Sequence, residues 1–159
     1  MWKTLAFALS LSCISVAWAG PNDPIISKAW VGESIPGQDT STLQLNLTTS
    51  KSVKLISVSS PVADAVEIHS LTMYSGKMKL QIVKSLPLPE RRTIAFGSKG
   101  LFLMMTGINK PLNIGDKVPL SLTFTFADKR TSVVTTIAEV KKMELSYKHY
   151  GPNEVYDHR

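Results

Sequence analysis

The fold is decided by the stretch Leu120-Ser121-Leu122-Thr123-Phe124-Thr125-Phe126, in which apolar and polar residues alternate strictly. Successive side chains of a β-strand point to opposite faces, so this alternation predicts a strand with one buried face. Its apolar side chains are expected to face the core: Leu120, Leu122, Phe124 and Phe126. The stretch therefore favours an all-β fold.

Similar short apolar segments recur on both sides of this stretch, and none has the sustained periodicity of a helix. Turn-forming residues separate the segments, for example Ser34-Ile35-Pro36-Gly37, Pro87-Leu88-Pro89 and Asn113-Ile114-Gly115-Asp116. We expect strands at residues 25–31, 43–47, 53–59, 66–73, 78–82, 92–96, 101–108, 118–126 and 132–138. Short strands at this spacing predict a β-sandwich or a barrel.

The amino terminus has the layout of a secretory signal peptide. Lys3 precedes an apolar run from Leu5 to Val16, and the small-residue box Ala17-Trp18-Ala19 follows. The run is about 12 residues long, shorter than the roughly 20 residues that a membrane-spanning helix requires. We therefore expect a cleaved signal peptide at residues 1–19, a single domain at 20–140 and a flexible polar tail at 141–159, in a periplasmic protein that has no membrane span after cleavage.

Charge and cysteine content exclude several classes of function. The formal net charge of +6 comes from scattered or paired basic residues such as Arg91-Arg92, so nucleic acid is not an expected partner. Cys13 is the only cysteine and lies inside the signal segment, where Ser10 and Ser12 do not form a convincing lipoprotein box. The mature chain then has no thiol, and His and Met are the remaining ligands for a soft metal.

Several sequence segments occur in the same order as in a known protein family. They are Ala29-Trp30-Val31, Ser59-Ser60-Pro61-Val62-Ala63, Val66-Glu67-Ile68-His69, Gly100-Leu101-Phe102-Leu103-Met104 and residues 111–120. Together they resemble the periplasmic copper chaperones called PCu(A)C, over about residues 24–138. The resemblance implies a cupredoxin-like Greek-key β-sandwich and a Cu(I) site.

The copper site of that family has a His, a Met eleven positions later, a second His twenty-two positions further on and a last Met two positions after it. Counted from His69, these positions are Leu80, Phe102 and Met104 in this chain. His69 and Met104 are therefore the inherited candidate metal ligands, while Leu80 and Phe102 carry no donor atom. The site with four family ligands cannot form here.

Two other methionines are candidates for the missing donors. Met73 follows His69 by four residues and Met78 precedes Leu80 by two, so both are expected on the face of His69. Met105 alternates away from Met104 and is expected in the core. The tail histidines, His149 and His158, lack a short-spaced cluster and are interpreted as solvated residues.

No sequence motif of an enzyme is present, and Asp64 and Glu67 are interpreted as solvent-facing charges. Two hypotheses remain. The first is a periplasmic metallochaperone that binds Cu(I) through a modified His/Met site and passes it to a partner such as a cytochrome oxidase assembly protein, as the resemblance implies. The second is a degenerate family member that binds no metal and acts as a protein-interaction module of the cell envelope.

Overall fold

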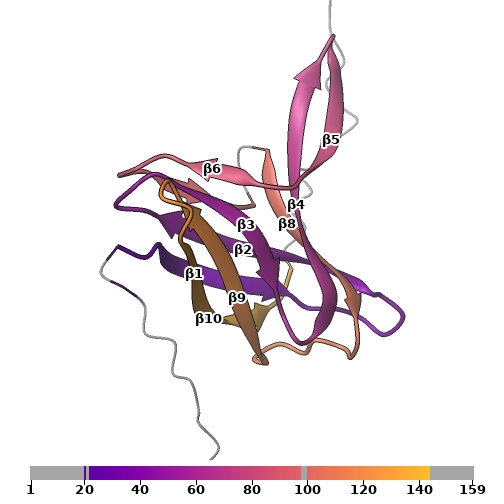
Figure 1. The fold of residues 1–159 in the computed structure, drawn as a ribbon. Helices are drawn as coiled ribbons and strands as arrows, with labels where there is room; N and C mark the ends of the chain where they lie inside the picture. Colours follow the sequence, from indigo (N-terminus) through magenta and orange to yellow (C-terminus); the bar gives the residue numbers. More distant parts are fainter. Residues whose placement is uncertain (1–19, 21, 98–99, 144–159) are drawn as a thin grey trace, which may run out of the picture.

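The computed structural model describes residues 20, 22–97 and 100–143, and the strands within them build the whole of the described fold (Figure 1). No helix occurs among these residues. The strands are β1 (Ile25–Gly32), β2 (Thr40–Thr48), β3 (Val53–Ser59), β4 (Ala63–Tyr74), β5 (Lys77–Val83), β6 (Leu86–Leu88), β7 (Thr93–Ala95), β8 (Leu101–Ile108), β9 (Lys117–Phe126) and β10 (Thr131–Lys141). The predicted all-β class is confirmed.

One strand was missed by the sequence analysis, because Pro87-Leu88-Pro89 reads as a turn. The structure has β6 there, pairing with β3 through Val53↔Leu88 and Lys54↔Pro87. Strand β6 lies at the end of the sheet order, where a proline can be accommodated because one side of the strand needs no partner. The side chain of Leu88 is only 2% exposed, so β6 is fixed to the body by burial of this leucine.

The strands close into a barrel. Neighbouring strands follow the order β4-β8-β2-β1-β10-β9-β3, and a further pairing of β3 with β4 at Val58↔Val66 joins the two ends. Strands β1 and β10 run parallel, whereas the other neighbours in this ring are antiparallel. The two layers of the expected sandwich are thus joined along both edges.

Strand β9 carries the centre of the core. Leu120, Leu122 and Phe124 are each no more than 1% exposed, as the alternation predicts. Phe126 is only partly buried, because it stands at the last position of the strand, beside the turn to β10. Each fully buried side chain of this size contributes about 1.5–3 kcal/mol to the free energy of unfolding. Met105 is fully buried as well, which confirms its predicted place in the core.

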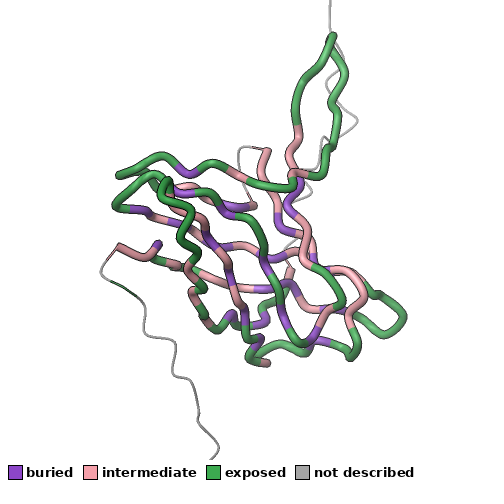
Figure 2. The backbone as a smooth tube through the Cα atoms, in the orientation of Figure 1, coloured by how far each residue is buried: buried purple, intermediate pink, exposed green. Residues whose placement is uncertain are grey.

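The outer part of the β4–β5 hairpin projects away from the barrel. Figure 1 shows the two strands continuing past the body, and Figure 2 shows exposed residues along both strands of the projecting part. Strand β4 pairs with β8 only from Ala63 to Ser70, and beyond that point β5 is its sole paired neighbour among the described strands. The hairpin therefore joins two environments, a covered base at the barrel and a solvent-exposed tip.

Candidate functional site

His69 stands where β4 leaves the barrel. Its register partners are Phe102 on β8 and Ile82 on β5. Residues directly opposite each other in antiparallel strands have side chains on the same face, so a large apolar side chain stands on either side of the imidazole. This arrangement explains why His69 is only 8% exposed on a face that is otherwise turned outward.

The two ring nitrogens of His69 have different surroundings. Nε2 lies 2.9 Å from Oε2 of Glu67, the residue two positions earlier on the same face of β4. Nδ1 is buried and finds no hydrogen-bond partner among the residues that the structure describes. When Nε2 carries the proton and donates to the carboxylate, Nδ1 presents a free lone pair, which is the state of a histidine that ligates a metal.

Glu67 was wrongly interpreted as a solvent-facing charge. Its side chain is 36% exposed and accepts the hydrogen bond from His69. The signal in the sequence was the spacing of two residues, which places both side chains on the same face of a strand. Asp64, the other acidic residue considered there, is exposed.

Met104 is the nearest candidate donor to His69. It pairs with Glu67 across β4 and β8, whereas Phe102 pairs with His69. Met104 is therefore the diagonal neighbour of His69 on the same face, at a typical separation of about 7–8 Å between Cα atoms. A long, flexible methionine side chain can bridge such a separation, so the register places these two residues within reach of one ion.

Leu80 and Phe102 occupy the other two positions of this constellation. Phe102 lies directly opposite His69, and Leu80 lies opposite Leu71, two residues further along β4. The backbone thus brings the positions counted from His69 to one face around the imidazole. Neither side chain has a lone pair to offer, so of these four positions only His69 and Met104 carry a donor atom.

Met73 and Met78 form a separate pair. They lie directly opposite each other near the tip of the hairpin and are 70% and 66% exposed. Met73 is four residues beyond His69 on a strand that rises about 3.3 Å per residue, which separates the two Cα atoms by roughly 13 Å. Both methionines share the face of His69, as expected, but the register does not bring them beside its imidazole.

The tail histidines were the other candidates considered for a metal. His149 and His158 lie outside the described residues. Within the described part of the chain, no three side chains of His, Cys, Asp or Glu gather into a group that could hold an ion. The same residues include no helix of the length and hydrophobicity needed to cross a membrane.

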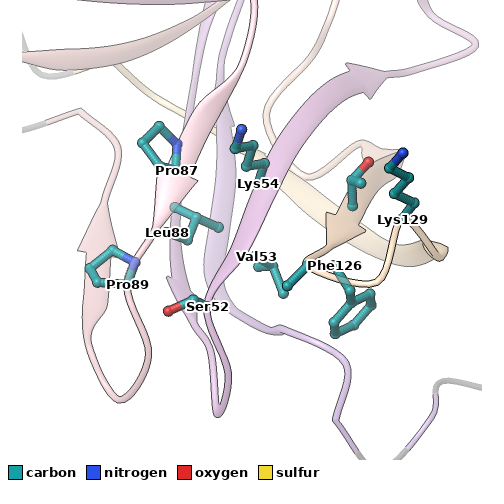
Figure 3. A pocket seen from close by; sticks show the side chains of 10 residues that line it. Ser52, Val53, Lys54, Pro87, Leu88, Pro89, Phe126 and Lys129 are labelled. Carbon is teal, nitrogen blue, oxygen red and sulfur yellow. The ribbon is translucent and has the colours of Figure 1, made fainter.

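A groove lies away from His69, between β3, β6 and the β9–β10 turn (Figure 3). Its volume is about 630 Å³, and the described residues that line it include no histidine or acidic side chain. Leu88, Val53 and Phe126 form a row across the three strands there, with Lys54 and Lys129 nearby. The groove therefore shares no residue with the His69 face.

Comparison with solved structures identifies domains of the same shape. The copper-bound PCuAC domain from PmoF2 has a TM-score of 0.60 at 18% identity, covering 76% of this chain and 93% of that chain. Apo-DR1885 from Deinococcus radiodurans has a TM-score of 0.60 at 24% identity, covering 91% and 95%. Its CuI form has a TM-score of 0.54 at 27% identity, covering 79% and 82%. These likenesses confirm the predicted cupredoxin-like fold.

Comparison of sequences identifies the family. A curated relative, "Putative lipoprotein Lxx21020" of Leifsonia xyli subsp. xyli, is 28% identical over 110 residues, covering 69% of this chain and 65% of that protein. The chain thus spans slightly less than two thirds of that relative. The family model described as "Putative lipoprotein LpqE-like" matches residues 25–137. Because this match extends from β1 into β10, the chain belongs to the LpqE-like family.

Proposed function

We propose that this protein is an exported, envelope-associated copper protein that binds Cu(I) through His69 and Met104. The observation that carries the proposal is the buried Nδ1 of His69, which has no partner in the described part of the chain while Nε2 is held by Glu67. A neutral imidazole and a thioether are donors that suit Cu(I), and they carry no charge that would attract a hard cation. The CuI form of DR1885 and the copper-bound domain from PmoF2 share the fold.

Glu67 has a positioning role in this proposal. Its carboxylate accepts the Nε2 proton, which fixes the tautomer and the orientation of the ring. Such outer partners also raise the basicity of the ligating nitrogen, and their loss typically costs about 10–100-fold in metal affinity. A Glu67→Ala variant should therefore bind Cu(I) more weakly while keeping both donors.

A site with two donors suits transfer of the ion. Two protein ligands leave coordination positions of Cu(I) open, so a partner can approach and take the ion by ligand exchange. We propose that the chain delivers copper in the periplasm after removal of residues 1–19, with a cytochrome oxidase assembly protein as the acceptor. The domain itself is proposed to catalyse no reaction.

The test is a competition titration of the chain from Gly20 with a Cu(I) chelator. Wild type should bind one Cu(I) at this site, and His69→Ala and Met104→Leu should each lose it. The double variant Leu80→Met with Phe102→His should bind more tightly than wild type, since the register already places both positions on the correct face.

Met73 and Met78 are tested in the same experiment. Met73→Leu with Met78→Leu keeps the volume and hydrophobicity of both side chains and removes only the sulfur atoms. If the tip pair contributes donors, as the sequence analysis predicts, this variant lowers the number of Cu(I) ions bound or the affinity. If His69 and Met104 act alone, it matches wild type.

The second candidate function is an envelope interaction module that has lost its metal. It is favoured by the two positions without a donor, Leu80 and Phe102. Equal and negligible Cu(I) binding by wild type, His69→Ala and the double restoration would contradict the copper proposal and leave this second function.

A further inference from the structure

The projecting β4–β5 hairpin has one apolar and one mixed face. The cross-strand pairs Leu71↔Leu80 and Met73↔Met78 lie on the face of His69 and Ile82. The pairs Thr72↔Lys79 and Tyr74↔Lys77 lie on the opposite face. The ribbon is thus as amphipathic as a strand that packs on a core, but beyond Ser70 no third strand within residues 22–97 and 100–143 pairs with it.

Solvent reaches the apolar side chains of this hairpin. Their exposed fractions are 70% for Met73, 74% for Tyr74, 66% for Met78, 53% for Leu80 and 61% for Ile82. Large hydrophobic side chains exposed singly are ordinary on soluble domains, whereas a contiguous group of them marks a surface that binds something. Figure 2 shows that this exposure extends around the tip of the hairpin.

The positive charge of the hairpin indicates the charge of the surface that would bind it. From Ile68 to Pro89 the sequence contains Lys77, Lys79 and Lys84 and no aspartate or glutamate. Among the described residues, none of these lysines forms an ion pair. The complementary surface is therefore both apolar and anionic. A second copy of the hairpin is disfavoured, because it would bring like charges together without an acidic residue between them.

The arrangement at the tip favours a lipid surface over an acidic protein. Met73 and Met78 occupy one face of the tip, and Tyr74 and Lys77 occupy the other, so a large exposed hydrophobic side chain stands on each face, with a lysine beside the tyrosine. A protein surface would cover one face of the ribbon. A membrane interface surrounds an inserted tip, accepts the amphipathic tyrosine and lets lysine ammonium groups reach the lipid phosphates.

We propose that the tip of the β4–β5 hairpin, residues 71–82, inserts into the headgroup region of a membrane that contains anionic lipid. This inference rests on the proposed envelope location but not on copper binding. The projection of the hairpin beyond the barrel provides the reach, because the tip can enter the interface while the body stays in water (Figure 1).

The experiment uses the chain from Gly20 and vesicles of phosphatidylcholine, with or without about one third phosphatidylglycerol. Wild type should sediment with the anionic vesicles only, and added salt should release it. Lys77→Gln with Lys79→Gln should lower the partition coefficient by about 25-fold, since each lysine near an anionic surface contributes about fivefold.

Two matched pairs of variants separate insertion from surface attraction. Met73→Gln with Met78→Gln should lower partitioning by at least about tenfold, whereas Met73→Leu with Met78→Leu should retain it because hydrophobicity is kept. Ile137→Gln replaces a side chain that is 63% exposed on β10, outside the hairpin, and should change nothing. In Tyr74→Trp, the emission of the new indole should shift to the blue on binding, after subtraction of the signal of Trp30.

Absence of wild-type binding to the anionic vesicles would overturn the proposal and leave an acidic protein as the partner. Binding with no blue shift, or with no loss in the glutamine variant, would overturn insertion of the tip. The two proposals can fail separately, because His69→Ala and the variant Met73→Leu with Met78→Leu remove candidate copper ligands but keep the apolar surface of the hairpin. Both variants should therefore bind the anionic vesicles as wild type does, whether or not the protein binds copper. A cytosolic location of the protein in cells would contradict the proposed envelope location, and the vesicle experiment would still decide whether the tip inserts into lipid.

Discussion

Strand β9 and the β4–β5 hairpin have the same sequence pattern and opposite environments. In β9, alternate apolar residues from Leu120 to Phe124 are no more than 1% exposed. In β5, the alternate residues Met78, Leu80 and Ile82 are 53% to 66% exposed. Alternation therefore determines which side chains share a face. Whether that face is covered depends on the side of the barrel wall that it occupies. The apolar residues of β9 point into the barrel, whereas Met78, Leu80 and Ile82 share the face of His69, which is turned outward.

The largest expected difference between the two regions is in how much the free energy of unfolding falls when an apolar side chain is removed. Phe124→Ala should lower the free energy of unfolding by about 3–5 kcal/mol, because it removes a buried ring and leaves a cavity. Leu80→Ala removes a side chain that is half exposed and should change it by no more than about 0.5 kcal/mol. Urea unfolding of both variants measures the contrast. A cost near 2 kcal/mol for Leu80→Ala would mean that the hairpin is covered in solution.

A smaller difference is expected at two glycines with positive φ. Gly100 has φ of +80°, and a Cβ atom there would lie 2.8 Å from the backbone oxygen of Leu71, at the point where the hairpin leaves the body. Gly76 has φ of +75° at the tip, and no atom of the described residues lies within 4 Å of such a Cβ. Gly76→Ala should lower the free energy of unfolding by only about 1 kcal/mol, which is the strain of an L-residue at positive φ.

Gly100→Ala should cost roughly 2 kcal/mol or more, because the clash also disturbs the hydrogen bond from the Leu71 amide to the Gly100 carbonyl. Thermal unfolding of the two variants gives the comparison. Equal costs would show that the junction relaxes, and that the hairpin is attached less rigidly than its hydrogen bonds indicate.

The smallest effect on stability is expected in an exposed turn of the body. As in the hairpin, changing one exposed side chain there should alter the free energy of unfolding only slightly. In the β9–β10 turn, the hydrogen bond from Arg130 holds the pKa of Asp128 below the ordinary value for aspartate. Because the pKa is lowered in the folded state, the stabilisation is present above the pKa of the unfolded chain and is lost as pH falls through the folded value. Wild type should therefore exceed Asp128→Asn slightly in stability at neutral pH.

That advantage should disappear in acid below about pH 4 and also in high salt, since the pair is exposed and screened. Unfolding curves for the two proteins across pH measure it, and NMR titration of the Asp128 carboxyl carbon gives the pKa directly. If wild type gained stability relative to Asp128→Asn as pH fell, the pKa of Asp128 would not be lowered in the folded state.

Part of the candidate site could be predicted because a strand has a fixed period. The spacing of two residues places Phe102 and Met104 on one face, and the register confirms that this face is shared with His69. The bond between His69 and Glu67 was missed, because two residues on one face do not determine whether their side chains turn toward each other or toward water. The gap between His69 and Met73 was underestimated, because facing the same way does not bring residues close along the strand.

Local alternation and turn chemistry were enough to predict the all-β class, the core face of β9 and most of the strands along the chain. They did not predict β6, where the packing of Leu88 on β3 overrides a local turn signal. They also did not predict that the sheet closes through β3 and β4, or that β4 and β5 continue beyond it. Closure and projection depend on which strands meet across the molecule, and that choice is set by long-range packing rather than by any single segment.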